Sequence, residues 1–318
     1  MKLWRATMLK NVLIIANPGS GVGEAPEHAQ TLSDFLSKNY KSKINLRETT
    51  KVGDAKEWAQ SAKSEGYDAV ICLGGDGTVN EVINGLMLVE NPPVFSFVPI
   101  GTANDLGRVL GFDMNPSEAI HQFKNLELDV LDIGQVNQQY FMDAVAIGEI
   151  PTAIMETDYE KKNRLGYLAY VTDAAKSIMA NEEKAYEVIN SKGEIYQLST
   201  KLIVIAMNSS LAGIEHLISH RKHNDGLMQI FALKGNVVMS GVETLATEAG
   251  IPEENVNDKK LMSFSDTEVS IHLAKGGDHE KVFSNVDGDR GPQLPLEIKV
   301  HKEALQVLRP SSQSDEHL

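Results

Sequence analysis

The feature that most constrains this chain is a glycine-rich turn between a buried strand and a helix. Residues Ala69 to Leu73 form a short, unbroken apolar run, and Gly74-Gly75-Asp76-Gly77-Thr78 follows directly. Apolar residues then recur at helical spacing, at Val79, Val82, Ile83 and Leu86. The glycines are expected to take positive φ and approach a ligand closely, and Thr78 to cap the helix. Because a helix start presents unpaired N–H groups and a positive dipole end, the turn suits a phosphate group.

The aspartate in this turn indicates a metal ion. Asp76 would repel a phosphate unless a cation lay between them, and Mg²⁺ prefers oxygen ligands. The alternative, an ordinary tight turn, would be favoured for a lone glycine turn. Two further turns argue against it: a strand from Phe95 runs into Gly101-Thr102-Ala103-Asn104-Asp105, and Asn17-Pro18-Gly19-Ser20-Gly21 also follows an apolar run. Polar turns at the carboxyl ends of parallel strands build one crevice.

The order of strand and helix signals predicts two domains. Strands and helices alternate up to about residue 130, which is typical of a mostly parallel sheet covered by helices. Strands then follow one another, including Tyr140 to Ile147, with one helix from about Leu165 to Met179 and a hairpin turn at Ser191-Lys192-Gly193. We therefore expect an α/β domain at 1–132, an antiparallel β-sandwich domain at 133–310 and a disordered tail at 311–318.

Charge and composition narrow the class of partners. The 318 residues carry a formal net charge of −14, which argues against nucleic acid, since its binding rests on neutralised phosphates. The single cysteine, Cys72, allows no internal disulfide and fits a reducing compartment. No stretch approaches the ~18 apolar residues of a spanning helix, so we expect a cytoplasmic protein with peripheral membrane contact. Lys161, Lys162 and Arg164 form a basic patch that fits either a solvated helix start or such contact.

Other nucleotide-binding motifs are absent from the sequence. A Walker A loop ends in Gly-Lys-Ser/Thr, whereas Gly23 is followed by Glu24. The dinucleotide fingerprint spaces its glycines differently from both Gly19-x-Gly21-x-Gly23 and the Gly74 turn. The chain also has no His-Glu-x-x-His sequence and no pair of cysteines for zinc.

Six segments together resemble one family. The sequence resembles the diacylglycerol kinase-like lipid kinases, bacterial members above all, and its motifs occur in that family's order over nearly the whole chain. The matching segments are Asn17 to Gly21, Thr49 with Gly53-Asp54-Ala55, Gly74 to Val82, Pro99 to Asp105, Asn224 to Leu227 and Val286 to Asp289. The resemblance implies a magnesium-dependent lipid kinase that transfers the γ-phosphoryl group of ATP to a hydroxyl of diacylglycerol or a related lipid.

The resemblance also implies roles for individual residues. Asp287 would be the general base, with the catalytic Asp289 beside it. Asp225 would hold a structural Mg²⁺ together with the backbone carbonyls of Lys222 and Leu227, and Asp76 and Asp105 would reach that ion through water. The nucleotide site would comprise Asn17, Pro18, Gly19, Ser20, Gly21, Thr49, Gly74, Gly75, Asp76, Gly77, Thr78, Val79, Asn80 and Thr102.

The sequence departs from the family pattern and leaves alternatives open. Val22 replaces a frequent lysine, Asp289 replaces a glutamate, Asp143 stands where many members have asparagine, and Arg221-Lys222-His223 replaces a less basic approach to Asp225. A kinase of a soluble substrate, such as NAD or a sugar, is one alternative. A nucleotide-binding regulator without turnover is another, which Val22 and Asp289 would support. The lipid partner would be met at a membrane surface, and a homodimer stays open.

Overall fold

The computed structural model describes residues 8–21, 23–148, 183–208, 222–233, 261–274 and 281–311. The chain divides into two compact units, one of Met1–Leu131 with Glu303–Leu318 and one of Asp132–Lys302. The first unit is α/β with a mostly parallel sheet, and the second is built from antiparallel strands. Both fold classes predicted from the sequence are confirmed.

The sheet of the first unit is parallel, and its central strands are buried. Its strands are hydrogen-bonded in the order β2-β1-β3-β4-β16. They are β1 (Asn11–Ala16), β2 (Lys43–Glu48), β3 (Ala69–Gly74), β4 (Val94–Pro99) and the last part of β16 (Leu296–Pro310). Every residue of β3 and β4 is buried, which explains why these strands read as continuous apolar runs in the sequence.

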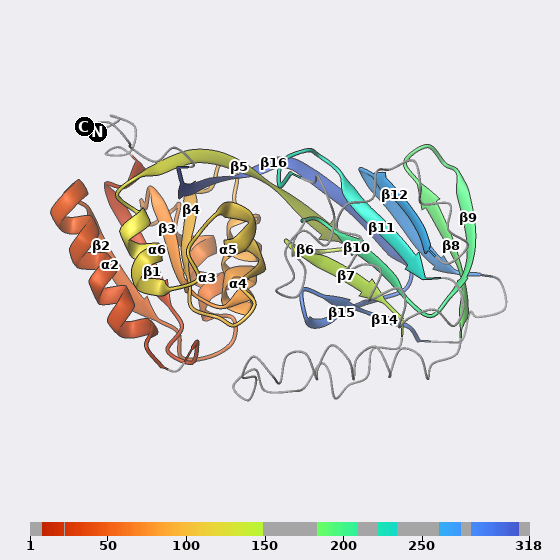
Figure 1. Ribbon diagram of the computed structural model, residues 1–318, viewed down its shortest axis with the longest axis horizontal. Coiled ribbons are helices and arrows are strands. Elements are labelled where there is room, and N and C mark those ends of the chain that lie inside the picture. The colour runs from red at the N-terminus through yellow and green to blue at the C-terminus, as the bar shows by residue number, and fades with distance from the viewer. Residues whose placement is uncertain are drawn as a thin grey trace. The chain divides into compact units, whose positions relative to one another are not determined.

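Helices cover both sides of this sheet. They are α2 (Ala25–Tyr40), α3 (Asp54–Ser61), α4 (Asp76–Leu86), α5 (Asp105–Leu110) and α6 (Pro116–Gln122). Helices α2 and α6 lie on one side of the strands, and α3 and α4 pack together on the other (Figure 1). In α2 the buried residues Ala29, Leu32 and Leu36 follow helical spacing, so one stripe faces the sheet.

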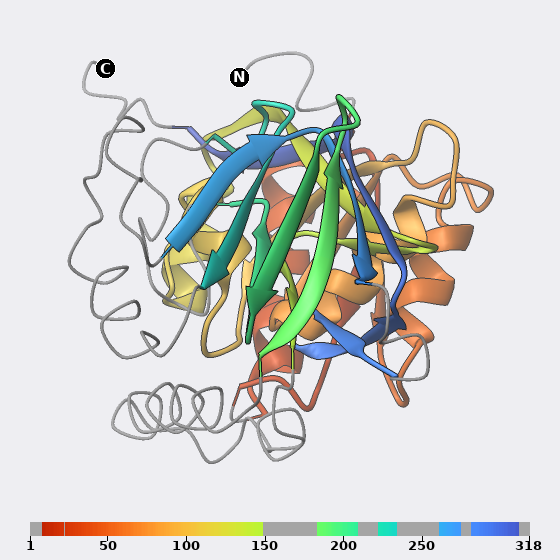
Figure 2. The ribbon, with the colours of Figure 1, turned by 90° about the vertical axis from the view of Figure 1, so that its right-hand side faces the viewer.

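The second unit contains two groups of antiparallel strands, drawn mainly in green to blue in Figure 2. One group has the order β12-β11-β10-β7-β14-β15, and the other joins β9, β8, β13 and the first part of β16. Their bounds are β7 (Ala144–Ile147), β8 (Lys184–Asn190), β9 (Ile195–Thr200), β10 (Ile203–Ala206), β11 (Met228–Leu233), β12 (Leu261–Asp266), β13 (Glu268–Leu273), β14 (Phe283–Val286) and β15 (Asp289–Gln293). Strands β5 (Leu126–Val136) and β6 (Gln139–Phe141) form a further antiparallel pair.

The hairpin predicted at Ser191-Lys192-Gly193 is confirmed. Strands β8 and β9 pair antiparallel on either side of it. Asn190 stabilises the turn because its side-chain oxygen accepts hydrogen bonds from the N–H groups of Lys192 and Glu194.

Three features of the second half differ from expectation or fall outside the described residues. The single strand predicted from Tyr140 to Ile147 is wrong: the chain breaks between β6 and β7, where the N–H groups of Met142 and Asp143 donate to a distant carboxylate instead of a neighbouring strand. Strand β16 is longer than predicted, and residues from Glu303 onward group with the first unit. The helix expected near Leu165–Met179 lies outside the described residues.

Candidate nucleotide and catalytic site

The turns singled out in the sequence meet at one edge of the first sheet. Because β1, β3 and β4 are adjacent and parallel, their carboxyl ends lie together. The side-chain N–H₂ of Asn17 donates to the hydroxyl of Thr78 at 2.8 Å, and the N–H of Gly75 donates to the hydroxyl of Ser20 at 3.3 Å. The N–H of Ile100 donates to the carbonyl of Gly74 at 3.0 Å. The three turns are thus one hydrogen-bonded assembly.

Gly74 and Gly75 are required for close packing rather than for positive φ. A Cβ on Gly74 would lie 2.6 Å from the Cβ of Thr78, and one on Gly75 would lie 3.2 Å from the Cα of Gly101. Neither residue has positive φ, so that expectation was wrong for this turn; within the opening turn, Gly21 has a φ of +65°. Gly74 makes room for the side chain of Thr78, and Gly75, with Gly101 opposite, lets the second and third turns touch backbone to backbone.

Helix α4 starts three residues earlier than expected, because its N-cap is Gly75 and not Thr78. Gly75 is its N-cap and Asp76 its first residue, so Thr78 lies inside the helix and does not cap it. The hydroxyl of Thr78 instead accepts from Asn17, and its side chain is buried. Val79 was assigned to the nucleotide site, but its side chain is in the core and its N–H donates to the carbonyl of Gly75. Asn80 directs its side-chain oxygen to the amide of Asn84.

The third turn is closed by Asn104. Its side-chain oxygen accepts from the N–H of Gly101 at 2.9 Å, and its amide donates to the carbonyl of Gly101 at 2.8 Å. Asn104 has a φ of +51°, a left-handed conformation that asparagine tolerates better than most residues. This closure leaves Thr102 exposed at the tip of the turn.

Asp76 ties the second turn to the third and brings two carboxylates together. Its two oxygens accept hydrogen bonds from the N–H groups of Asn104, at 2.9 Å, and Asp105, at 3.0 Å. Burial, followed by repulsion from the Asp105 carboxylate, raises the pKa of Asp76 to about 6. A cation near this pair would relieve the repulsion, which is the electrostatic condition that the sequence predicted for Mg²⁺.

Thr49 stands at the carboxyl end of β2, beside the opening turn, where its N–H donates to the carbonyl of Ala16. The carboxylate of Asp54 holds the following loop by accepting from the N–H and hydroxyl of Thr50 and the N–H of Lys51. These bonds, the one from the Thr50 N–H foremost, lower the pKa of Asp54. The sequence offered a signal for this role, because an aspartate at a helix start often binds the preceding turn.

Asp287 lies in the turn between β14 and β15. One of its oxygens accepts from the N–H groups of Asp143 and Ala144, at 3.0 and 2.9 Å, and the other from that of Met142 at 2.8 Å. Its φ of +48° is left-handed. Asp289 begins β15, and partial burial raises the pKa of its carboxyl. The carboxylate of Asp287 is therefore held firmly, and that of Asp289 lies two residues further along the chain.

The expected magnesium ligands lie in the turn before β11. The carboxylate of Asp225 accepts from the N–H of Leu227 at 3.0 Å, and the N–H of Gly226 donates to the buried Asp132 at 2.5 Å. Among the described residues, no group of three or more His, Cys, Asp or Glu side chains is placed to hold a metal. An ion bound here would need the backbone carbonyls of Lys222 and Leu227 as well as water, an oxygen donor set that fits Mg²⁺.

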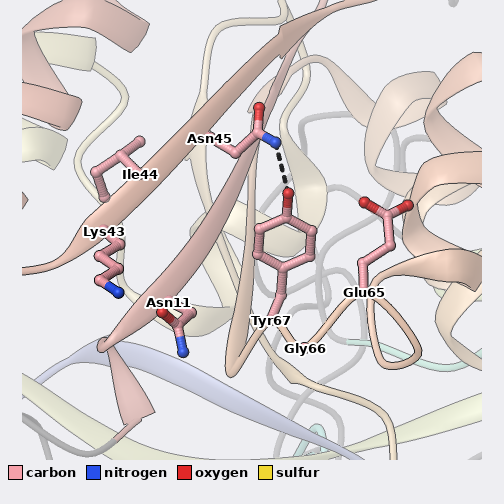
Figure 3. Close-up of a pocket in the computed structure, with 7 residues that line it drawn as sticks. All are labelled: Asn11, Lys43, Ile44, Asn45, Glu65, Gly66 and Tyr67. Atoms are coloured by element: carbon pink, nitrogen blue, oxygen red, sulfur yellow. Dashed lines mark hydrogen bonds between the residues drawn. The ribbon is translucent and has the colours of Figure 1, made fainter.

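A pocket of about 330 Å³ lies at the opposite, amino-terminal ends of β1 and β2. It is lined by Asn11, Lys43, Ile44, Asn45, Glu65, Gly66 and Tyr67 (Figure 3). The amide of Asn45 donates to the hydroxyl of Tyr67, and Glu65 pairs with Arg47 at 2.5 Å. None of the candidate site residues lines this pocket.

Comparisons with known proteins place the chain in a family. Residues 11–136 match the family described as the diacylglycerol kinase catalytic domain. A diacylglycerol kinase of Bacillus subtilis (strain 168) is 30% identical over 313 residues, which cover 97% of this chain and 99% of the relative. The chain belongs to the diacylglycerol kinase-like lipid kinase family. Another family member, a diacylglycerol kinase of Staphylococcus saprophyticus, is 31% identical over 98% of this chain and 99% of its own length.

A solved structure of a diacylglycerol kinase from Bacillus anthracis shares the fold, with a TM-score of 0.73 and 22% identity over 95% of this chain and 97% of the other. As a member of this family the chain is a lipid kinase and uses a nucleotide. Within the part of the chain that the structure describes, no helix is long and apolar enough to span a membrane.

Proposed function

We propose that this lipid kinase transfers the γ-phosphoryl group of ATP, with Mg²⁺, to a free hydroxyl of diacylglycerol or a closely related glycerolipid. The observation that carries the proposal is the joining of the three turns at the carboxyl edge of β1, β3 and β4. The diacylglycerol kinase names of the relatives support the choice of lipid.

The nucleotide would lie against the start of α4. Gly77, in the first turn of this helix, is exposed, and a Cβ added there would meet no protein atom within 4 Å. The fold therefore does not require glycine at this position, although glycine weakens a helix. A ligand that approaches the helix start explains its presence, and phosphate is the group such a start favours. Asn17 to Gly21, Thr49 and Thr102 would border the same nucleotide.

Magnesium would serve this site by neutralising the negative charge of the phosphates. The structural ion would be held by Asp225 and the carbonyls of Lys222 and Leu227, and the link of Asp76 and Asp105 to that ion through water is part of the proposal. The chain's own contribution is the rigid placement of these oxygens, since backbone N–H groups hold the carboxylates of Asp76 and Asp225.

Asp287 would accept the proton of the acceptor hydroxyl, with Asp289 beside it. Both oxygens of its carboxylate are held by backbone N–H groups, those of Met142, Asp143 and Ala144. The three N–H groups fix the carboxylate before the substrate arrives, which is the positioning that general base catalysis needs.

The lipid would be met at a membrane surface by peripheral contact. Lys161, Lys162 and Arg164, the local basic patch proposed for that contact, lie outside the described residues. A cytoplasmic location and a homodimer remain part of the same proposal.

The test is an assay with labelled ATP and Mg²⁺ across diacylglycerol, sphingoid bases, NAD and sugars, with lipids presented in mixed micelles and in vesicles. We expect phosphorylation of diacylglycerol and weak or no transfer to soluble polyols. Transfer to NAD or a sugar without any lipid product would replace the proposed acceptor. Nucleotide binding without turnover on any substrate would indicate a regulator.

A further inference from the structure

We propose that Glu81 is a positioning residue for nucleotide binding, acting through the loop Thr50–Gly53 that follows Thr49. The inference rests on the proposed nucleotide site. It adds a residue that stands outside the glycine-rich turns themselves, in the second turn of helix α4.

The contact that carries the inference joins α4 to a loop 28 residues away in the sequence. The N–H of Gly53 donates to both carboxylate oxygens of Glu81, at 3.1 and 3.0 Å. Gly53 is the N-cap of α3 and has a φ of +92°, and α3 has no side-chain cap of its own. Glu81 therefore places a negative charge at the positive end of α3, from a neighbouring helix.

A close crossing of α3 and α4 brings Glu81 to this position. Gly85 lies one helical turn after Glu81, and a Cβ on it would come within 2.3 Å of the carbonyl oxygen of Lys56 and 2.9 Å of the Cβ of Ala59. Because glycine permits this backbone approach, the start of α3 lies within reach of the Glu81 carboxylate.

Glu81 and Asp54 hold the loop from its two ends. Asp54 accepts the donors of Thr50 and Lys51, and Glu81 accepts the N–H of Gly53. Between these anchors Val52 is 92% exposed, so the loop has no apolar packing at its tip to fix it. Apart from the backbone hydrogen bond from the N–H of Asp54 to the carbonyl of Lys51, the two carboxylates hold its conformation.

The loop matters to the nucleotide because of where it begins. Thr49 precedes it, and its N–H donates to the carbonyl of Ala16, next to Asn17 of the opening turn. Asn17 in turn donates to Thr78 in α4, the helix that carries Glu81. Loss of the Glu81 contact would release one side of the site while the glycine turns keep their own hydrogen bonds.

The experiment compares Glu81→Ala, Glu81→Gln and the control Glu57→Gln. Glutamine keeps one acceptor for Gly53, whereas alanine keeps none. Glu57 is exposed in the first turn of the same helix α3 and bonds Gly53 only through its own backbone N–H, so its substitution removes the same charge near the same helix start without removing an acceptor of the Gly53 N–H. The readouts are the Kd for ATP by calorimetry, KM for ATP and kcat with the lipid substrate, and the unfolding temperature.

We expect Glu81→Ala to raise the Kd and KM for ATP about tenfold, as for loss of a charge-assisted hydrogen bond, while kcat at saturating ATP stays within about twofold. Glu81→Gln should restore most of the affinity, and Glu57→Gln should match the unmodified protein. If Glu81→Ala does not fold, Glu81→Asp tests the same point, because it keeps the charge but shortens the reach.

Several outcomes would overturn the inference. One is an unchanged Kd for ATP in Glu81→Ala, even if its unfolding temperature is lower. Another is a fall in the kcat of Glu81→Ala with KM for ATP unchanged. A third is a loss of ATP affinity in Glu81→Gln as large as in Glu81→Ala. The proposed function fails separately: if the unmodified protein binds ATP but phosphorylates no lipid, the Kd values still decide the role of Glu81. An unmodified protein that binds no nucleotide overturns both.

Discussion

Asp76 and Asp287 each set a carboxylate against backbone N–H groups from another segment. Asp76 accepts from Asn104 and Asp105, and Asp287 accepts from Met142, Asp143 and Ala144. A buried N–H left without a partner costs about 1–3 kcal/mol, so both side chains contribute to the fold as well as to the proposed chemistry. For variants at these residues, the free energy of unfolding must therefore be measured as well as the activity.

Substitution by asparagine should separate the roles of the two proposed catalytic aspartates, Asp287 and Asp289. Asp287→Asn should lose about 100-fold or more in turnover, the usual range for a removed base. It should also lower the unfolding temperature, because an amide N–H₂ replaces an oxygen that accepts from backbone N–H groups. Asp289→Asn should leave the unfolding temperature unchanged and lower turnover less. A larger loss of turnover in Asp289→Asn would transfer the base role to Asp289, and normal turnover in both would remove the mechanism.

Asp76 should make the free energy of unfolding of this protein depend on pH. The folded-state pKa of Asp76, about 6, lies above its ordinary value of 3.8, so the folded state holds the proton more tightly. The stability that this group contributes is full below about pH 4 and is lost as pH rises through about 6, by about 3 kcal/mol at most. Asp76→Asn has no such titration.

Thermal unfolding without Mg²⁺ or nucleotide, from about pH 4 to about pH 8, checks this prediction. The unfolding temperature of Asp76→Asn should rise relative to that of the unmodified protein as pH increases. The amide also gives up one acceptor, but that cost does not vary with pH. A difference that stays constant across the range would show that Asp76 does not have a raised pKa.

Helix α4 is the element that connects the parts of the first unit. Its first turn faces the glycine-rich turns, its second turn carries Glu81, and Gly85 permits the close contact with α3. Two glycines in the same helix are therefore present for different reasons. Gly85 is required by protein packing, whereas Gly77 has no protein neighbour to accommodate.

Gly85 and Gly77 form a matched pair for substitution by alanine. Gly85→Ala should lower the free energy of unfolding by about 1–3 kcal/mol, because its Cβ would meet the Lys56 carbonyl oxygen at 2.3 Å. Gly77→Ala should raise the free energy of unfolding by about 0.5–1 kcal/mol and weaken ATP binding. Denaturant unfolding and calorimetry measure the two effects. Unchanged ATP affinity in a stabilised Gly77→Ala would count against the site. Gly75→Ala is a poorer probe, since its Cβ would press on Gly101.

The sequence predicted the strands and their order along the chain well, but it predicted the contacts between distant elements poorly. Buried runs such as Val94–Pro99 are visible because local composition determines them. The break between β6 and β7 was missed because its cause, Asp287, lies about 145 residues further along. The Glu81 contact with Gly53 was missed for the same reason. The glycines of the turns were visible in the sequence. Whether Gly74 makes room for a ligand or for a neighbouring side chain could be decided only from the structure.

For the whole molecule, the net charge of −14 works against attraction to anionic lipid. Substituting Lys161, Lys162 and Arg164 by glutamine should lower activity on lipid presented in vesicles. It should leave activity on a short-chain, monomeric analogue unchanged, because only surface docking depends on the patch. Glutamine at the exposed Lys10, Lys38 and Lys63 gives the same change of charge elsewhere and should have no effect on either substrate. Equal losses on both presentations would show that the patch serves something other than docking.

Strand β16 has a consequence for the order in which this protein can be made. The first unit starts before the second in the sequence, but its sheet also contains Glu303 to Pro310, which are translated only after the second unit. Leu305, Val307 and Leu308 are buried there, and the hydroxyl of Ser96 in β4 donates to the carbonyl of Leu308. A nascent chain therefore carries β4 as an open strand edge, the kind of surface that invites wrong pairing, until the whole second unit has been translated. A premature stop anywhere in the second half deprives the nucleotide-binding unit of a core strand, even though residues 11–136 have long been translated.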